Sequence, residues 1–371
     1  MEPMMGIITT TKSEDILKEL TQHRCMSSVP FGGRYRMIDF TLSNMVNSGI
    51  HNIGVITSHK YRSLMDHLGA GKEWGLDRKS EGLMILPSAS PSIFKKNIRF
   101  DLKDLYENYE YLEKSRQKYL LLTGNNMICN INYKDALQFH LKNNAQVTVF
   151  YKEEICHEKT INELGFWDVE ADGRVTGFHL TPSVGEKNKV SLEMIIMERE
   201  LLMDMIQVAH AMGNWDLADI LAANLNDLRI YAYQFKGYLA KINSVESYYK
   251  CNMELLDPDV WYELFFKNGP IYTKIKDGPP TKYADDAKTA KVLVGTGCKI
   301  MGNVENSILF RGVTIGRGAS VKNSIIMQKT EIEENVVLEN VILDKEVRIR
   351  KGTILKGGQD SPIVIAKKSV I

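Results

Sequence analysis

The chain has 371 residues, a length that predicts two or three domains. Lysine and arginine number 47 against 46 aspartate and glutamate residues, so the net charge of +1 offers no overall electrostatic attraction to nucleic acid or to an acidic membrane. Apolar residues make up 44% and charged residues 25%, ordinary values that exclude a wholly disordered or coiled-coil chain.

The five cysteines are odd in number and none lies in a C-x-x-C motif, so neither a disulfide framework nor a cysteine zinc site is expected. No uncharged apolar run approaches the roughly 18 residues that suggest a membrane span. The first residues lack the basic and apolar regions of a signal peptide. We therefore expect a reduced, cytoplasmic protein with no membrane and no nucleic-acid partner.

The first 255 residues or so alternate strand-like and helix-like segments. Short apolar runs at 4–10, 52–57, 119–122 and 146–151 predict buried strands. Apolar residues at helical spacing over 102–115 and 133–143 predict helices between them. This alternation indicates an α/β domain with a mainly parallel sheet. Residues 165–179 read as an inserted hairpin that turns at Asp172-Gly173.

A different pattern begins near residue 292 and continues to about 355. Aliphatic residues recur there at a spacing near six, which predicts one short strand per beat and three strands per coil of a parallel β-helix. The regular positions are Leu309, Ile315, Val321, Ile326, Ile332 and Leu338, followed more loosely by Ile342, Val347 and Ile354. We expect an α/β domain over 1–255, a proline-rich and glycine-rich linker over 256–290, and the β-helix over 291–371.

Residues 29–50 combine a glycine-rich turn with positive charge. Gly32 and Gly33 fit a tight loop, and Arg34 and Arg36 follow directly. Backbone N–H groups and guanidinium forks of this kind can cradle a phosphate. On spacing alone, a plain turn with solvated arginines explains the segment equally well.

The segment 29–50 is similar to one in the ADP-glucose pyrophosphorylases, also called glucose-1-phosphate adenylyltransferases. The likeness continues through the motifs at 74–78, 231–238, 247–248 and 252–256, and it ends in the β-helix. It therefore covers nearly the full chain with the motifs in order. The resemblance implies a nucleotidyltransferase domain of Rossmann-like, GT-A-like type, followed by a left-handed parallel β-helix. The family reaction joins ATP and glucose 1-phosphate to give ADP-glucose and pyrophosphate with Mg²⁺.

The positions that the resemblance assigns to catalysis have changed here. The family's essential acid after the strand at 119–122 aligns with Asn125, and a second family acid aligns with Lys241. A neutral amide and a cation cannot supply the charge that draws Mg²⁺ into a phosphate site. We expect no metal site and no cofactor on this chain.

The phosphate-binding and sugar-binding positions differ as well. The family's glycine-rich loop aligns with 9–15, which has no glycine and contains Lys12. Leu180 and Thr181 stand in the family's Glu-Lys-Pro motif, and Glu193 stands at a family glycine. Adenylyl transfer depends on positioning and on neutralising charge, so we expect no catalytic residues here.

This pattern resembles the GlgD-type subunits of bacterial glycogen synthesis. The resemblance implies a regulatory chain that assembles with a catalytic ADP-glucose pyrophosphorylase subunit, and that this partner uses Mg²⁺. The resemblance also implies that the hetero-oligomer is a tetramer. A homo-oligomer of this chain is the other assembly we consider. Whether the chain is itself an enzyme stays open. The alternatives are a slow or repurposed nucleotidyltransferase, an acyltransferase and a sugar-nucleotide sensor. The β-helix contains no histidine for a general base, which counts against the acyltransferase.

Four basic residues form a candidate site for a phosphorylated metabolite effector: Arg34, Arg36, Lys60 and Arg62. Members of the family are typically regulated by such metabolites, so the resemblance motivates this hypothesis. Ordinary surface charge is the competing interpretation.

Overall fold

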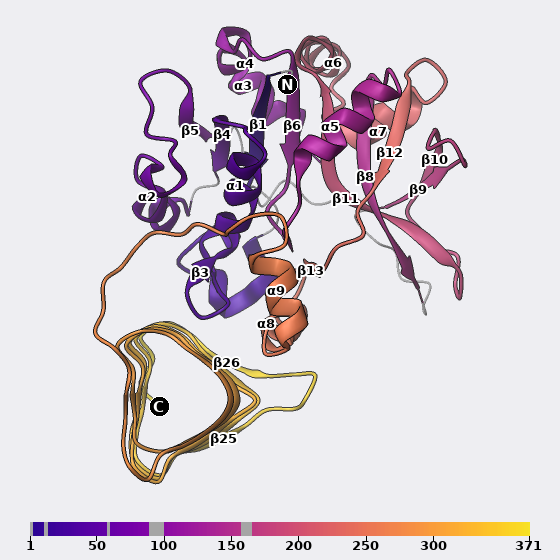
Figure 1. The fold of residues 1–371 in the computed structure, drawn as a ribbon. Helices are drawn as coiled ribbons and strands as arrows, with labels where there is room; N and C mark the ends of the chain where they lie inside the picture. Colours follow the sequence, from indigo (N-terminus) through magenta and orange to yellow (C-terminus); the bar gives the residue numbers. More distant parts are fainter. Residues whose placement is uncertain (1–2, 11–13, 58–59, 89–99, 157–164) are drawn as a thin grey trace. The chain divides into compact units, whose positions relative to one another are not determined.

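A computed structural model describes residues 3–10, 14–57, 60–88, 100–156 and 165–371. The chain divides into two compact units (Figure 1). The first, which we call the sheet unit, comprises Met1–Ser13, Thr41–Tyr61 and Gly69–Gly237. The second, the β-helix unit, comprises Glu14–Phe40, Arg62–Leu68 and Tyr238–Ile371, so the chain enters it three times.

The sheet unit is built on nine strands, and seven of them follow the order β10-β9-β11-β6-β1-β4-β5. β1 is parallel to both β4 and β6, and β4 is parallel to β5. β8 lies between β11, to which it is antiparallel, and β12, to which it is parallel. The strands are β1 (Met4–Thr9), β4 (Asn52–Thr57), β5 (Gly82–Pro87), β6 (Tyr119–Thr123), β8 (Val147–Ile155), β9 (Phe166–Val169), β10 (Val175–His179), β11 (Lys187–Glu198) and β12 (Ile230–Gln234).

All four apolar runs that predicted strands are strands in the structure, and most of their side chains are fully buried. Strands covered on both faces read as continuous apolar runs, which is why these were visible in the sequence. The hairpin is also confirmed, because β9 and β10 are antiparallel and Gly173 takes a φ of +90° in the turn. The α/β class is therefore confirmed.

The helix predicted over 102–115 is two helices, α3 (Leu102–Glu107) and α4 (Tyr109–Lys114). Asn108 separates them: its side-chain amide donates to the carbonyls of Pro87 and Asp104, so the side chain competes with helix continuation. The other helices are α1 (Met37–Asn47), α2 (Arg62–Leu68), α5 (Tyr133–Lys142), α6 (Arg199–Met212), α7 (Leu217–Ala223), α8 (Val245–Glu254) and α9 (Pro258–Phe265). No described helix is long and apolar enough to cross a membrane.

The β-helix of the second unit is triangular when viewed along its axis (Figure 1). Its strands pair in parallel, and equivalent residues of successive coils lie 17 positions apart, as at Asn306 and Asn323. Its strands are β14 (Lys282–Tyr283), β15 (Lys288–Val294), β16 (Lys299–Ile300), β17 (Asn303–Leu309), β18 (Thr314–Ile315), β19 (Ser320–Lys322), β20 (Ile325–Ile326), β21 (Glu331–Ile332), β22 (Val337–Glu339), β23 (Val341–Leu343), β24 (Arg348–Ile349), β25 (Ile354–Lys356) and β26 (Ile363–Ile365).

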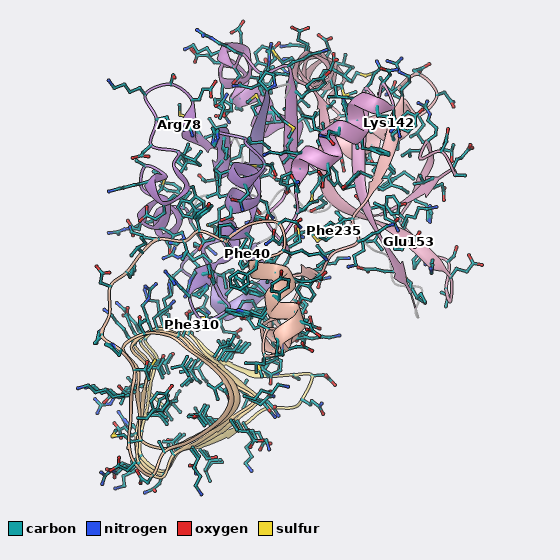
Figure 2. All side chains as sticks on the ribbon, in the orientation of Figure 1. Phe40, Arg78, Lys142, Glu153, Phe235 and Phe310 are labelled. Atoms are coloured by element: carbon teal, nitrogen blue, oxygen red, sulfur yellow. The ribbon has the colours of Figure 1, made fainter. Side chains whose placement is uncertain are left out.

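The predicted β-helix is thus confirmed, with one strand interval per coil shortened from six residues to five. The shortened corner is formed by Asn306, Asn323 and Asn340, with φ of +44°, +47° and +52°. Asparagine tolerates this left-handed conformation better than other residues with a side chain. The prediction that Ile354 points into the core was wrong. Ile354 is 64% exposed, and its neighbour Leu355 packs against the core instead. Figure 2 shows the aliphatic side chains of successive coils stacked in the interior.

Candidate functional site

The glycine-rich segment of the β-helix unit forms a tight two-stranded turn, β2 (Pro30–Phe31) with β3 (Tyr35–Arg36). Gly32 and Gly33 have φ of +60° and +76°, which explains two glycines in a row. α8 fixes the turn in place: Tyr248 donates its hydroxyl hydrogen to the carbonyl of Pro30 at 2.5 Å. The amide of Gly32 donates to the side-chain oxygen of Asn252 at 3.0 Å.

Arg36 is held by α2 and by the first turn of α1. Its guanidinium donates to the carbonyl and the hydroxyl of Ser63, at 2.5 and 3.0 Å. Its backbone amide donates to Asp39, whose other oxygen lies 2.5 Å from Nε2 of His67. Burial lowers the pKa of Arg36 to about 10, so the guanidinium stays charged at neutral pH.

Arg24 forms the most deeply buried ion pair with a carboxylate that the described residues show. Its Nη2 contacts Asp344 of the β-helix, and the side chains are 4% and 0% exposed. The Nη1 atom of Arg24 is buried and has no hydrogen-bond partner among the described residues. A buried donor without an acceptor costs free energy, and an incoming anion would satisfy it.

Further cations lie close enough to Arg24 and Arg36 to affect one another's charge. Burial lowers the pKa of Lys345 to about 6, and Arg36 and Arg24 add to the shift. Lys276 is exposed at the surface, and its partial desolvation lowers its pKa, with Arg311 as the next cause. We call this set the cation cluster: Arg24, Arg36, Lys276, Arg311 and Lys345.

Burial is the largest cause of each of these shifts, and neighbouring cations lower the pKa values of Arg36, Lys276, Arg311 and Lys345 further. Such a concentration of basic groups favours an anion with several oxygens, because guanidinium forks bind phosphate and carboxylate strongly.

Of the four effector residues predicted from the sequence, only one belongs to the cation cluster. Arg36 belongs to the cation cluster, and Arg34 is exposed and contributes to lowering the pKa of Arg311. Arg62 is exposed at the start of α2 in the same unit, whereas Lys60 belongs to the sheet unit.

Sequence reasoning missed Arg24, Lys276, Arg311 and Lys345. Arg311 and Lys345 stand at one corner of the β-helix, two coils apart, with Gln328 between them. A search for basic residues at the 17-residue period would have found this pair. Arg24 and Lys276 carry no such signal, since only the fold brings them near the corner.

In the sheet unit, two of the predicted degenerate positions, Asn125 and Glu193, lie at the carboxyl end of β6, where open α/β sheets bind ligands. Asn125 and Asn126 follow β6 directly and are 2% and 5% exposed. Glu193 lies on β11 and is 4% exposed, with a φ of +50°. Leu180 and Thr181 are exposed after β10. Lys241, on β13 (Leu239–Lys241), belongs to the β-helix unit, and Lys12 lies outside the described residues.

The residues at the expected metal positions do not fit Mg²⁺. Mg²⁺ is held by carboxylates, and a lone amide such as Asn125 offers no charge. Across the described residues, no group of three or more histidine, cysteine, aspartate or glutamate side chains is placed to hold a metal ion.

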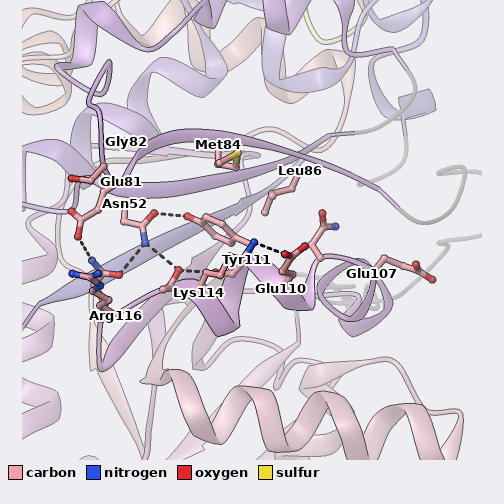
Figure 3. A pocket seen from close by; sticks show the side chains of 14 residues that line it. Asn52, Glu81, Gly82, Met84, Leu86, Glu107, Glu110, Tyr111, Lys114 and Arg116 are labelled. Carbon is pink, nitrogen blue, oxygen red and sulfur yellow. Dashed lines mark hydrogen bonds and ion pairs between the residues drawn. The ribbon is translucent and has the colours of Figure 1, made fainter.

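A separate cavity of about 550 Å³ lies beside β5 and α4 in the sheet unit (Figure 3). Its polar side chains are already hydrogen-bonded to one another: Tyr111 donates to Asn52, and Gln117 donates to Glu81. None of the residues predicted from the sequence lines it.

Comparison with known proteins places this geometry in context. A family model described as nucleotidyl transferase matches residues 15–258, and one described as the GlmU-like C-terminal hexapeptide matches residues 279–361. The chain is 38% identical to the glycogen biosynthesis protein GlgD of Bacillus subtilis, over 98% of this chain and 96% of the relative. It is 40% identical to GlgD of Geobacillus stearothermophilus, over 99% and 97%. Glucose-1-phosphate adenylyltransferase of Thermotoga maritima is 36% identical, over 82% and 72%.

Proposed function

The chain belongs to the nucleotidyl transferase family and groups with its GlgD glycogen biosynthesis proteins, and from this premise we propose that it is a non-catalytic, regulatory subunit of glucose-1-phosphate adenylyltransferase in glycogen synthesis. The observation that carries the proposal is Asn125 at the carboxyl end of β6, where the resemblance calls for a metal-binding acid. Removing one electrostatic group commonly lowers an enzyme's rate by about 10²–10³. Lys241 in place of the second acid adds to this loss.

The regulatory part of the proposal rests on the cation cluster. The buried Arg24 nitrogen has no acceptor among the described residues, and several basic side chains lie near it, so together they supply the donors that a phosphorylated metabolite needs. An effector regulates only if it binds one state of the assembly more tightly than another. We propose that the effector binds this cluster and that the chain transmits its effect to a catalytic partner in a hetero-oligomer.

The test measures ADP-glucose formation from ATP and glucose 1-phosphate in three samples: this chain, the catalytic subunit from the same organism, and the two co-purified. We expect no product from this chain alone and an altered kcat or effector response in the mixture. A substantial Mg²⁺-dependent rate from this chain alone would overturn the non-catalytic assignment. The absence of both association and kinetic change would overturn the regulatory one.

The effector site is tested in the same mixture with Arg36→Ala. We expect the response of kcat to phosphorylated metabolites to fall while co-purification is retained. Arg350→Ala is the matched control, because Arg350 is an exposed arginine of the β-helix outside the cluster. An unchanged response in Arg36→Ala would remove the cluster from the proposal.

A further inference from the structure

Glu193 combines two features that each cost free energy. Its side chain is a carboxylate that is almost completely buried, and its backbone has a φ of +50°. Burial penalises a charged group, and the left-handed conformation penalises any residue that has a β-carbon. Residues held in such conformations gather at ligand sites, where the surrounding structure enforces them.

The position of Glu193 is fixed by an irregularity in β11. The pairing of β11 with β8 shifts register between Ser191 and Ile195, so Glu193 lies in a bulge. A bulge re-aims the side chain it carries. The carbonyl of Glu193 accepts a hydrogen bond from the amide of Gly124 at 3.3 Å, which ties the bulge to the loop after β6.

The carboxylate lies against that loop. A β-carbon built on Gly124 would lie 3.3 Å from Oε2 of Glu193 and 3.2 Å from Oδ1 of Asn126. Two oxygens that accept hydrogen bonds therefore face one small region at the carboxyl end of β6. The Asn126 oxygen is buried and accepts no hydrogen bond from any described residue. A phosphate entering this region would meet acceptors instead of the donors it needs.

Little room is left beside the carboxylate. The void that Glu193 borders has a volume of about 10 Å³, and Phe100 and Trp167 form part of its wall. Ligand pockets are typically about 300–1,000 Å³. The described residues therefore leave no space of ligand size in this void beside Glu193.

We infer that the Glu193 carboxylate occupies the space at the carboxyl end of β6 and so prevents sugar phosphates from binding there. The occlusion is an added feature, separate from the loss of the metal-binding acids. The inference rests on the proposed function for its ligand class, because sugar phosphates are substrates of the reaction assigned there to the partner.

The test measures binding of glucose 1-phosphate to the full chain by calorimetry. Glu193→Gly and Glu193→Ala remove the carboxylate, and we expect each to bind glucose 1-phosphate at least tenfold more tightly than the unsubstituted chain. Glu193→Gln keeps the volume and removes the charge. Unchanged weak binding in Glu193→Gln assigns the occlusion to volume, and a gain assigns it to charge; both support the inference.

Asn144→Gly is the control for backbone effects. Asn144 is exposed between α5 and β8 with a φ of +46°, so Asn144→Gly makes the same kind of backbone change away from β6. Only Glu193→Gly should gain binding of glucose 1-phosphate.

Equal binding by the unsubstituted chain and Glu193→Gly would overturn the inference, as would no gain in any folded Glu193 variant. The readout needs no catalytic partner. A gain in binding without any kinetic effect on the partner would therefore leave the occlusion standing and refute the regulatory proposal.

Discussion

The carboxyl end of β6 presents hydrogen-bond acceptors, whereas the cation cluster presents hydrogen-bond donors, so the two regions should respond to an anion in opposite ways. At the first, the buried Glu193 and Asn126 each place a side-chain oxygen against Gly124. At the second, Arg24 is buried with a donor nitrogen that has no acceptor among the described residues, and Arg36 and Lys345 lie close enough for Arg24 to lower their pKa values. Each arrangement costs folding free energy, so each is informative. Under the two proposals made above, the chain has closed one anion site and kept another, which suits a subunit that senses a metabolite without converting it.

The largest expected effect comes from breaking the buried pair of the cluster. Arg24→Ala leaves the carboxylate of Asp344 buried without its cation, and we expect the free energy of unfolding to fall by about 3–5 kcal/mol. Urea denaturation measures it. Lys351→Ala breaks the exposed pair with Glu334 and should change the free energy of unfolding far less, because water screens an exposed pair. Equal effects would show that Arg24 is not buried as described.

The anion preference of the cluster is tested next. Arg311→Ala should weaken binding of inorganic phosphate by about tenfold or more, since hydrogen bonds to charged groups contribute about 1.5–3 kcal/mol. Calorimetry with Arg350→Ala as the control measures the difference. If both variants bind phosphate equally, the anion does not use this corner of the β-helix.

The third prediction concerns pH. The pKa of Lys345 is lowered to about 6, so its amine is mostly neutral at pH 8 and charged below pH 6. A bound anion favours the charged form and raises this pKa. Phosphate affinity should therefore rise as pH falls from 8 to 6, by up to about tenfold per pH unit after correction for the phosphate's own titration.

Lys345→Met should flatten the corrected pH profile, and Lys351→Met should not, because Lys351 is exposed. If phosphate affinity still depends steeply on pH in Lys345→Met, the proton taken up on binding belongs to another group, such as His67 or Lys276.

The smallest effect concerns the corner that shortens each coil. Asn323→Ala places alanine at a φ of +47° and removes the hydrogen bond from Asn306, so we expect a loss of about 1–2 kcal/mol in the free energy of unfolding. Asn323→Gly removes the same hydrogen bond but keeps the backbone conformation accessible, and thermal denaturation should show a smaller loss. A smaller loss in Asn323→Ala would contradict the role of the corner.

Local patterns made the strands and the β-helix predictable, because each depends on which side chains face a core. The break at Asn108 was missed because it depends on the carbonyl of Pro87, which sequence spacing does not reveal. The shift from Ile354 to Leu355 was missed because a strict six-residue beat ignores the asparagine corner.

The candidate site was less accessible from the sequence than the fold. Asn125 and Glu193 could be singled out because a resemblance supplied positions with which to compare them. Arg36 was singled out because it follows two glycines. Arg24 has no local signal, since its partner Asp344 is 320 positions away.

That separation has a consequence for synthesis. Residues 14–40 belong to a unit whose remaining strands are translated last. At about 5–20 residues per second, Arg24 waits roughly 16–64 s for Asp344 to be made. During that time the segment carries a guanidinium and apolar side chains with no finished surface to pack on. Residues 14–40 therefore stay accessible to chaperones and proteases until the last coils of the β-helix are made.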